Sequence, residues 1–287
     1  MDGRHNLRSY NRIMDMDELV APSLDADLAR RFGGVARLYG DAAFERFRQA
    51  RIAVVGIGGV GSWAAEALAR SAVGTLVLID LDHIAESNTN RQIHALGDEY
   101  GKAKVTAMAE RVRAINPSAQ VRCIEEFVAP DNVAELVRDV DTVVDCIDQV
   151  SAKAALIAHC RAAKIDVVTC GAAGGRTDPT RIRSADLARV AGDPLLAKVR
   201  YRLRQRYGFP RDGAGRTRKF GVVAVYSDEP VRPPIGACAP KPDLAAGLAC
   251  AGYGSTVAVT APLGFAAAAV VLDRIARRAH GAGMSAT

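Results

Sequence analysis

The chain has 287 residues, of which 49% are hydrophobic and 24% are charged. This composition is typical of a globular protein and excludes a mainly disordered chain. The formal net charge of +6 is modest, but it is unevenly distributed. Residues 181–219 hold twelve basic and three acidic side chains, a net charge of +9, so the rest of the chain sums to −3. The excess positive charge therefore belongs to one segment, which points to an anionic partner there.

The cysteines and the apolar runs bear on the cellular compartment. None of the six cysteines forms a C-x-x-C pair, which argues against a zinc knuckle and a thioredoxin-type redox motif. Residues 1–12 are polar and lack the apolar core of a secretory signal, so we expect reduced thiols and a cytoplasmic location. Residues 244–272 carry no charge and are numerous enough to span a membrane. Their many Gly, Ala, Ser and Thr residues favour a helix in the protein core, with membrane contact as the alternative.

Apolar patterning predicts alternating strands and helices up to about residue 175. A helical segment is expected at 28–49, after a polar arm. We expect strands at 51–55, 75–80, 119–125, 141–145 and 165–169, and helices at 62–71, 102–115, 130–139 and 151–163. A strand at 220–226, a Pro- and Gly-rich loop at 228–243 and a helix at 257–279 follow. Such alternation predicts an α/β fold with a Rossmann-like, doubly wound, mostly parallel sheet and a C-terminal α/β extension.

A glycine-rich turn follows the first predicted strand directly and opens a helix. Gly56, Gly58 and Gly61 fit the pattern G-x-G-x-x-G, which in this context is typical of a phosphate-binding loop. Asp80 ends the next strand, where a carboxylate can accept hydrogen bonds from ribose hydroxyls. The glycine motif alone would favour NAD.

The charged residues farther along the chain favour ATP instead. Arg91 and Lys104 supply two cations near a nucleotide that is already bound through its ribose. Asp148, at the end of a strand, can bind Mg²⁺. A cofactor that only carries hydride needs little positive charge around it. A triphosphate under nucleophilic attack needs cations, because they neutralise the negative charge of the departing pyrophosphate. Each residue alone also has a structural explanation, as a solvated charge or, for Asp148, as the N-cap of helix 151–163.

These motifs together resemble the ubiquitin-activating-like ThiF/MoeB/HesA superfamily, whose members adenylate a carboxylate with ATP. The resemblance rests on Gly56-Ile-Gly-Gly-Val-Gly61, Asp80-Leu-Asp82, Ser87-Asn-Thr-Asn-Arg-Gln92, Lys104 and Asp145-Cys-Ile-Asp148. Stretches 31–40, 56–70, 88–96, 153–158 and 171–175 are most similar to the tRNA threonylcarbamoyladenosine dehydratases of that superfamily. We accordingly divide the chain into a polar arm (1–27), an ATP-binding adenylation domain (28–175) and a C-terminal segment packed on the same domain (176–287).

The resemblance also implies roles for individual residues. Arg91, Lys104 and Asp148 would act in catalysis, with Asp148 binding the metal. Arg37 would reach into the active site of a partner subunit, which implies a homodimer. The residues that would contact ATP are Gly56, Gly58, Gly59, Gly61, Asp80, Asp82, Asn88, Arg91 and Lys104.

The basic segment contains a predicted helix with Asp193 as N-cap and Gly208 beyond its end. Leu196, Val199, Leu203 and Tyr207 fall on one face of this helix. The density of arginine favours contact with an RNA phosphate backbone, as opposed to a merely solvated face, a membrane surface or an acidic protein. The residues expected to contact tRNA are Arg200, Arg204, Arg206, Arg218 and Lys219.

The resemblance implies ATP-dependent cyclisation, by dehydration, of N6-threonylcarbamoyladenosine in tRNA through an acyl adenylate, with release of pyrophosphate and AMP. The alternative is an adenylyltransferase for the C-terminus of a small sulfur-carrier or ubiquitin-like protein, with Cys238 as a reactive thiol and a cysteine desulfurase or sulfur acceptor as partner. That alternative predicts loss of activity in Cys238→Ala, although the paired zinc motifs of sulfur-carrier activators are absent from the sequence. A nucleotide-sensing module would instead bind ATP without releasing pyrophosphate.

Overall fold

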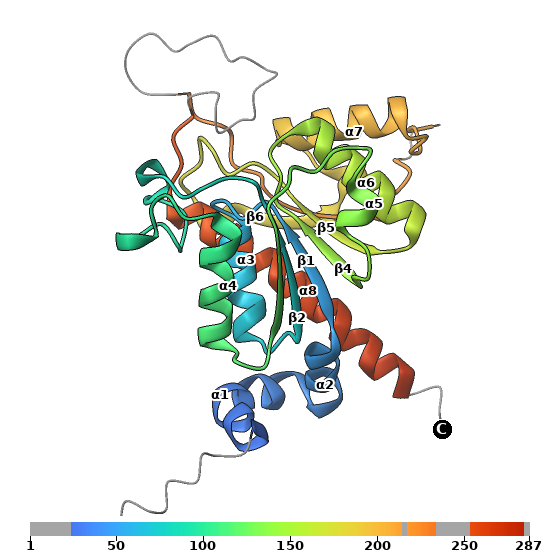
Figure 1. The fold of residues 1–287 in the computed structure, drawn as a ribbon. Helices are drawn as coiled ribbons and strands as arrows, with labels where there is room; N and C mark the ends of the chain where they lie inside the picture. The colour runs from blue at the N-terminus through green and yellow to red at the C-terminus, as the bar shows by residue number, and fades with distance from the viewer. Residues whose placement is uncertain (1–23, 214–216, 234–252, 284–287) are drawn as a thin grey trace, which may run out of the picture.

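The computed structural model describes residues 24–213, 217–233 and 253–283. Their strands form one sheet in the order β3-β2-β1-β4-β5-β7-β6, in which only the edge strand β6 is antiparallel to its neighbour (Figure 1). The strands are β1 (Arg51–Val55), β2 (Thr75–Ile79), β3 (Gln120–Ile124), β4 (Thr142–Asp145), β5 (Asp166–Cys170), β6 (Ile182–Asp186) and β7 (Val223–Ser227). The predicted doubly wound, mostly parallel sheet is confirmed.

Helices cover both faces of the sheet, as parallel strands require. They are α1 (Leu24–Tyr39), α2 (Asp41–Gln49), α3 (Gly61–Arg70), α4 (Lys104–Ile115), α5 (Val133–Leu136), α6 (Val150–Ala163), α7 (Pro194–Arg206) and α8 (Val257–Gly283). Ile52 and Val54 of β1 pack into a core with α2, α3, α4 and α8. Ala53 and Val55 point to the opposite face and pack with α5, α6 and α7. This alternation, with a period of two residues, divides the core into two layers.

Several predicted elements differ from the structure. The predicted helix 28–49 is two helices, because Gly40 adopts a φ of 84° between them. The predicted helix 130–139 shortens to the four residues of α5, and strand 220–226 becomes β7, which begins at Val223. Cys123, in the predicted strand 119–125, is exposed because β3 lies at the edge of the sheet.

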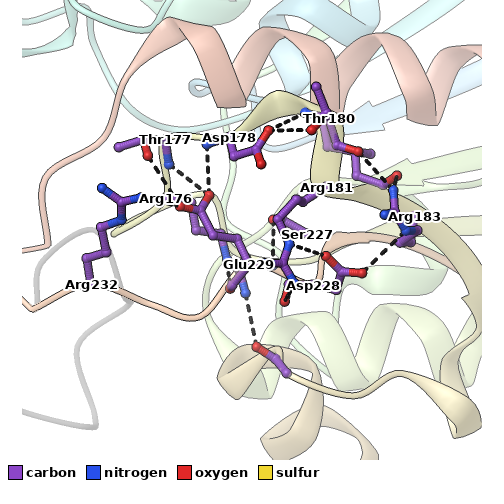
Figure 2. Close-up of polar contacts among 12 residues, drawn as sticks. Arg176, Thr177, Asp178, Thr180, Arg181, Arg183, Ser227, Asp228, Glu229 and Arg232 are labelled. Atoms are coloured by element: carbon purple, nitrogen blue, oxygen red, sulfur yellow. Dashed lines mark hydrogen bonds and ion pairs between the residues drawn. The ribbon is translucent and has the colours of Figure 1, made fainter.

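Strand β6 was not predicted, and a polar network explains how it is held (Figure 2). Asp228, just after β7, accepts hydrogen bonds from Arg181 at 2.7 Å and forms an ion pair with Arg183 of β6 at 3.3 Å. The neighbouring Glu229 accepts the backbone N–H groups of Thr177 and Asp178 at 2.9 and 2.8 Å. These contacts stabilise the edge of the sheet with polar side chains, so the segment lacks the apolar alternation that identifies a strand.

The uncharged run contributes the core helix α8. Val259, Leu263, Ala267 and Val271 are buried against α2, α3 and the sheet. The helix is also long and apolar enough to cross a membrane, and half of its most apolar 18-residue stretch is buried in the structure. Residues 257–272 therefore form a core helix as predicted, whereas residues 244–252 lie outside the described part of the chain.

Helices α3 and α8 approach closely at Gly264. A Cβ atom added there would collide with the carbonyl oxygen of Val60 and lie 2.9 Å from the backbone nitrogen of Ala64. The contact involves the first turn of α3, which follows the glycine-rich turn directly. The absence of a side chain at Gly264 thus sets the distance between α8 and the beginning of α3.

We expect Gly264→Ala to lower the free energy of unfolding by about 1–2 kcal/mol. The added methyl group forces main-chain atoms apart, which costs about 1–3 kcal/mol, and the better helix propensity of alanine offsets up to about 1 kcal/mol of this. Urea unfolding measures the difference. Gly213→Ala is the control, because a Cβ there meets nothing within 4 Å. Equal stability of Gly264→Ala and the wild type would contradict the close packing.

Candidate active site

The glycine-rich turn forms a phosphate loop (residues 56–61) between β1 and α3. Gly56 has a φ of +87°, which disfavours any other residue, and its N–H donates to the Ile79 carbonyl at 2.9 Å. A Cβ on Gly61 would collide with the Gly56 carbonyl. The loop therefore presents main-chain N–H groups at the beginning of a helix, an arrangement that favours anions.

Asp80 holds this loop against the end of β2. Its Oδ2 atom accepts the N–H of Ile57 at 2.6 Å, and its Oδ1 atom accepts the N–H of Asp82 at 2.9 Å. Burial raises the pKa of Asp80, although the charge of Lys104 and the two N–H groups oppose the rise. Asp80 thus orders the phosphate loop itself, and its contact with a ribose stays a prediction.

Lys104 is a buried cation at the beginning of α4. Its side chain is only 7% exposed, and its Nζ lies 2.7 Å from Oδ2 of Asp82, which is 56% exposed. The ammonium also lowers the pKa of the neighbouring Asp80. Lys104 is therefore not a solvated surface charge, and the site interpretation is favoured over that alternative.

Arg91 lies over the phosphate loop. A Cβ added to Gly59 would come within 3.1 Å of Cγ of Arg91. Nη1 of Arg91 donates to the Ser87 carbonyl at 2.8 Å and to Oδ1 of Asn90 at 2.9 Å. Among the residues that the structure describes, no carboxylate pairs with this guanidinium. Its positive charge is therefore available to an anion beside the loop.

Asn88 has a structural contact within the same turn. It is buried, and its Oδ1 atom accepts the N–H of Ala85 at 3.1 Å. Its carbonyl accepts the N–H groups of Arg91 and Gln92 at 3.0 and 2.9 Å. Asn88 therefore shapes the turn that carries Arg91, and its contact with phosphate stays a prediction.

Three residues that the motifs did not identify hold this turn from outside. Nε1 of Trp63 on α3 donates to the Arg91 carbonyl at 2.9 Å, and Oγ1 of Thr260 on α8 lies 3.5 Å from the same oxygen. The N–H of Val257 donates to the Asn90 carbonyl at 3.0 Å. Thr260 is 169 residues away from Arg91 in sequence, so no local pattern could have revealed its contact.

Asp148 is exposed in the loop that follows β4. Helix α6 takes Gln149 as its N-cap and has no side-chain cap, so the predicted N-cap alternative for Asp148 is wrong. The described residues provide no hydrogen-bond or ion-pair partner for its carboxylate and contain no cluster of three ligands that could hold a metal alone. Mg²⁺ commonly binds one or two carboxylates together with substrate phosphates, and a free carboxylate beside a phosphate loop fits this mode.

Arg37 is not near the phosphate loop of its own chain. It is exposed on α1, and that helix lies at the end of the sheet where the strands begin (Figure 1). The carbonyl of Phe47 in the adjoining helix α2 accepts the N–H of Gly74, just before β2. The phosphate loop follows the opposite end of β1. A role for Arg37 in catalysis therefore requires a second subunit.

The basic segment forms α7, on the face of the sheet opposite α3 and α8. Leu196, Val199 and Leu203 are buried as predicted, and Oδ1 of the N-cap Asp193 accepts the N–H of Leu196 at 2.9 Å. Tyr207, predicted on the same apolar face, is exposed, because the helix ends at Arg206. Residue Cys238 lies outside the described part of the chain.

The arginines of α7 border a groove of about 300 Å³, lined by Ala197, Arg200, Tyr201, Arg204, Gln205 and Arg211. Arg204 pairs with Asp212 at 3.0 Å and lies over the ring of Phe220. Nη1 of Arg200 is buried and has no partner within the described residues. Arg206, Arg218 and Lys219 are exposed.

Comparison with known proteins identifies the family of the chain. The model of the ThiF family matches residues 31–272. The chain belongs to the ThiF family. Among ThiF-family relatives, the tRNA threonylcarbamoyladenosine dehydratase of Escherichia coli K12 is 48% identical over 257 residues, which cover 87% of this chain and 95% of that protein. The enzyme of the same name from Haemophilus influenzae is 46% identical over 253 residues, 87% of this chain and 94% of its own.

Solved structures of ThiF-family relatives have the same fold. The crystal structure of E. coli tRNA N6-threonylcarbamoyladenosine dehydratase, TcdA, in complex with ATP is 47% identical, with a TM-score of 0.79 over 88% of this chain and 97% of that one. The complex of the same enzyme with AMP gives a TM-score of 0.81 at 46% identity, over 91% and 99% of the two chains. The shared fold thus extends over nearly the whole length of these nucleotide-bound relatives.

His94 lies close to this site but has a structural environment. It is buried, and neither ring nitrogen has a partner among the described residues. Burial and the charges of Lys104 and Arg111 lower the pKa of His94 from 6.5 to about 4. The folded protein therefore keeps His94 neutral where the unfolded chain protonates it, so stability falls as the pH drops from 6.5 towards 4.

We expect the wild type to lose about 2 kcal/mol more stability than His94→Leu when the pH falls from 7 to 5. The value follows from the two pKa values of the histidine, because leucine cannot take up the proton. Urea unfolding of both proteins at the two pH values measures the difference. Parallel pH dependences would show that His94 does not cause the loss.

Proposed function

We propose that this chain is an ATP-dependent tRNA threonylcarbamoyladenosine dehydratase. It cyclises the threonylcarbamoyl side chain of the modified adenosine through an acyl adenylate and releases pyrophosphate and AMP. The observation that carries the proposal is the position of Arg91 over the phosphate loop, which the buried Lys104 also flanks. In the part of the chain that the structure describes, no carboxylate pairs with the guanidinium of Arg91. Identity of 48% to the E. coli dehydratase, across 95% of that protein, supports the same substrate.

The first step activates the threonyl carboxylate, which is a poor electrophile because it is anionic. A carboxylate oxygen attacks the α-phosphorus of ATP, and the bond from that phosphorus to the β-phosphate oxygen breaks. Arg91 and Lys104 neutralise the charge that pyrophosphate carries away, and Arg37 of a partner subunit adds a third cation. Asp148 would hold Mg²⁺, which when bound offsets phosphate charge.

The second step closes the ring. A nitrogen or oxygen of the carbamoyl group attacks the activated carbonyl, a carbamoyl N–H loses its proton, and the bond to AMP breaks. The carboxylate oxygen leaves with AMP, which accounts for the net dehydration. Since nucleophile and electrophile belong to one side chain, proximity supplies much of the barrier reduction, about 7–11 kcal/mol in well-oriented cases.

We infer a homodimer, since Arg37 can act only across a subunit boundary. Its neighbour Leu38 is 76% exposed on the same end of α1. We also infer one domain for residues 28–287, because β6 and β7 extend the sheet of the nucleotide-binding half and α8 packs on its core. A cytoplasmic location accords with a tRNA substrate.

The groove on α7 is where we place the tRNA backbone. Burial and the neighbouring Arg204 lower the pKa of Arg200, which indicates a guanidinium short of counter-charge. The exposed Arg206, Arg218 and Lys219 extend the positive surface beyond the groove. Contacts of this kind position RNA without reading its sequence.

Pyrophosphate release should depend on tRNA that carries the threonylcarbamoyl group, and it should fall about 100- to 1000-fold in Asp148→Ala. The exposed Asp131→Ala is the control. Release is measured with modified tRNA, with tRNA lacking the modification, and without tRNA. Release that ignores the modification would refute the proposed substrate, and full activity of Asp148→Ala would remove this residue from the site.

We expect Arg206→Ala and Arg218→Ala to weaken tRNA binding and to leave ATP binding unchanged. Each lost phosphate contact should reduce the slope of log affinity against log salt by about 1. Filter binding at several salt concentrations measures the slope. The exposed Arg138→Ala is the control, because Arg138 lies just before the beginning of β4 and outside the basic segment 181–219. An unchanged slope in both variants would place the tRNA elsewhere.

A further inference from the structure

A lysine and an aspartate form a fully buried ion pair at the end of β4. Nζ of Lys153, on the first turns of α6, lies 3.0 Å from Oδ1 of Asp145, the last residue of β4. Both side chains have no exposed surface. Burial raises the pKa of Asp145, while the charge of Lys153 lowers it. Because removing two charges from water is costly, such a pair requires that its remaining donors and acceptors be satisfied.

Three of the four remaining hydrogen bonds of the pair involve main-chain groups of Asp145 and Ile147, at the end of β4 and just beyond it. Besides the carboxylate, the Lys153 ammonium donates to the carbonyls of Asp145 at 3.2 Å and Ile147 at 2.8 Å. Oδ1 of Asp145 accepts the N–H of Ile147 at 3.2 Å, and Oδ2 accepts the hydroxyl of Thr169 at 2.7 Å. All three donors of the ammonium are therefore used.

Ile147 is thus bound through both its N–H and its carbonyl, and it directly precedes Asp148. The preceding residue, Cys146, donates its N–H to the Val55 carbonyl at 2.8 Å. A Cβ added to Gly56 would lie 3.0 Å from the carbonyl of Cys146. The buried pair therefore fixes a loop that touches the phosphate loop on one side and carries Asp148 on the other.

Stability alone does not account for this arrangement. A buried ion pair can often be replaced by uncharged residues of similar volume without loss of stability. Apolar residues would fill the same space, but they could not bind the main-chain carbonyls of Asp145 and Ile147 as the ammonium of Lys153 does. The contacts with the loop are what a lysine provides here and an apolar side chain does not.

We propose that Lys153 is a positioning residue for ATP binding. It fixes the main chain of Ile147 so that the carboxylate of Asp148 faces the phosphate loop, where it meets a divalent cation bound with ATP. Lys153 is itself buried and touches neither nucleotide nor tRNA. The proposal rests on the proposed function, because it assigns to Asp148 the role given there.

The test uses a double variant, Asp145→Asn/Lys153→Met, in which no charge is left buried without a partner. ATP binding is measured with Mg²⁺ and with EDTA through the fluorescence of Trp63, the only tryptophan of the chain, whose indole contacts the Arg91 carbonyl. We expect the melting temperature to stay close to that of the wild type. In the double variant, the ratio of the ATP dissociation constant in EDTA to that in Mg²⁺ should be at least tenfold lower than in the wild type, as in Asp148→Ala. The dissociation constant in EDTA itself should change little.

Lys164→Met removes the same charge from the exposed end of the same helix, so it should keep the wild-type ratio. If the double variant does not fold, Lys153→Arg replaces it. A planar guanidinium keeps the charge opposite Asp145 but cannot place its donors as an ammonium does, so an intermediate ratio is expected.

A wild-type ratio in the double variant, or in Lys153→Arg where that variant replaces it, would overturn the proposal. A wild type whose ATP affinity ignores Mg²⁺ would overturn it too. Failure of the proposed function looks different: pyrophosphate release would ignore modified tRNA, while the Mg²⁺ dependence of ATP binding would still respond to Lys153.

Discussion

The phosphate loop is held against the loop that follows β4 by contact between main-chain atoms, and the other groups of the site are arranged around that contact. Gly56 faces the carbonyl of Cys146 with no room for a side chain between them. The two loops meet because β1 and β4 are adjacent and parallel, so both end at the same edge of the sheet. A ligand in the phosphate loop is therefore within reach of the side chains on the loop that follows β4. The order of the strands thus decides which residues can act together.

Around this contact the structure separates two kinds of charge. Cations that we assign to ATP are held individually, Lys104 by an acid and Arg91 by the Ser87 carbonyl and the side-chain amide of Asn90. Cations that we assign to RNA lie together on α7 and beyond it, where few acids interrupt them. A small ligand whose charge shifts during reaction needs fixed partners, whereas a polyanion needs only a continuous surface. The uneven charge of the sequence reflects this division.

Features that depend on local patterns could be predicted from the sequence. The parallel strands are continuous apolar runs, and the phosphate loop has a motif that its flanking elements confirm. Features that depend on distant contacts could not, as with β6, whose polar partners follow β7, and Thr260, which reaches Arg91 across the chain. Lys153 lies between these cases. A single charge between the alanines of an apolar helix was visible in the sequence, but only the structure shows that it is buried and what it binds.

Helix α8 touches both ends of the sheet. At its beginning, Val257 and Thr260 contact the turn that carries Arg91. Near its end, Arg274 and Arg278 pair with Asp166 at the beginning of β5. A helix that left the sheet to enter a lipid bilayer would remove the supports of Arg91 and open the core along α3. Insertion of α8 into a membrane is therefore incompatible with this fold and with the position of Arg91 in it.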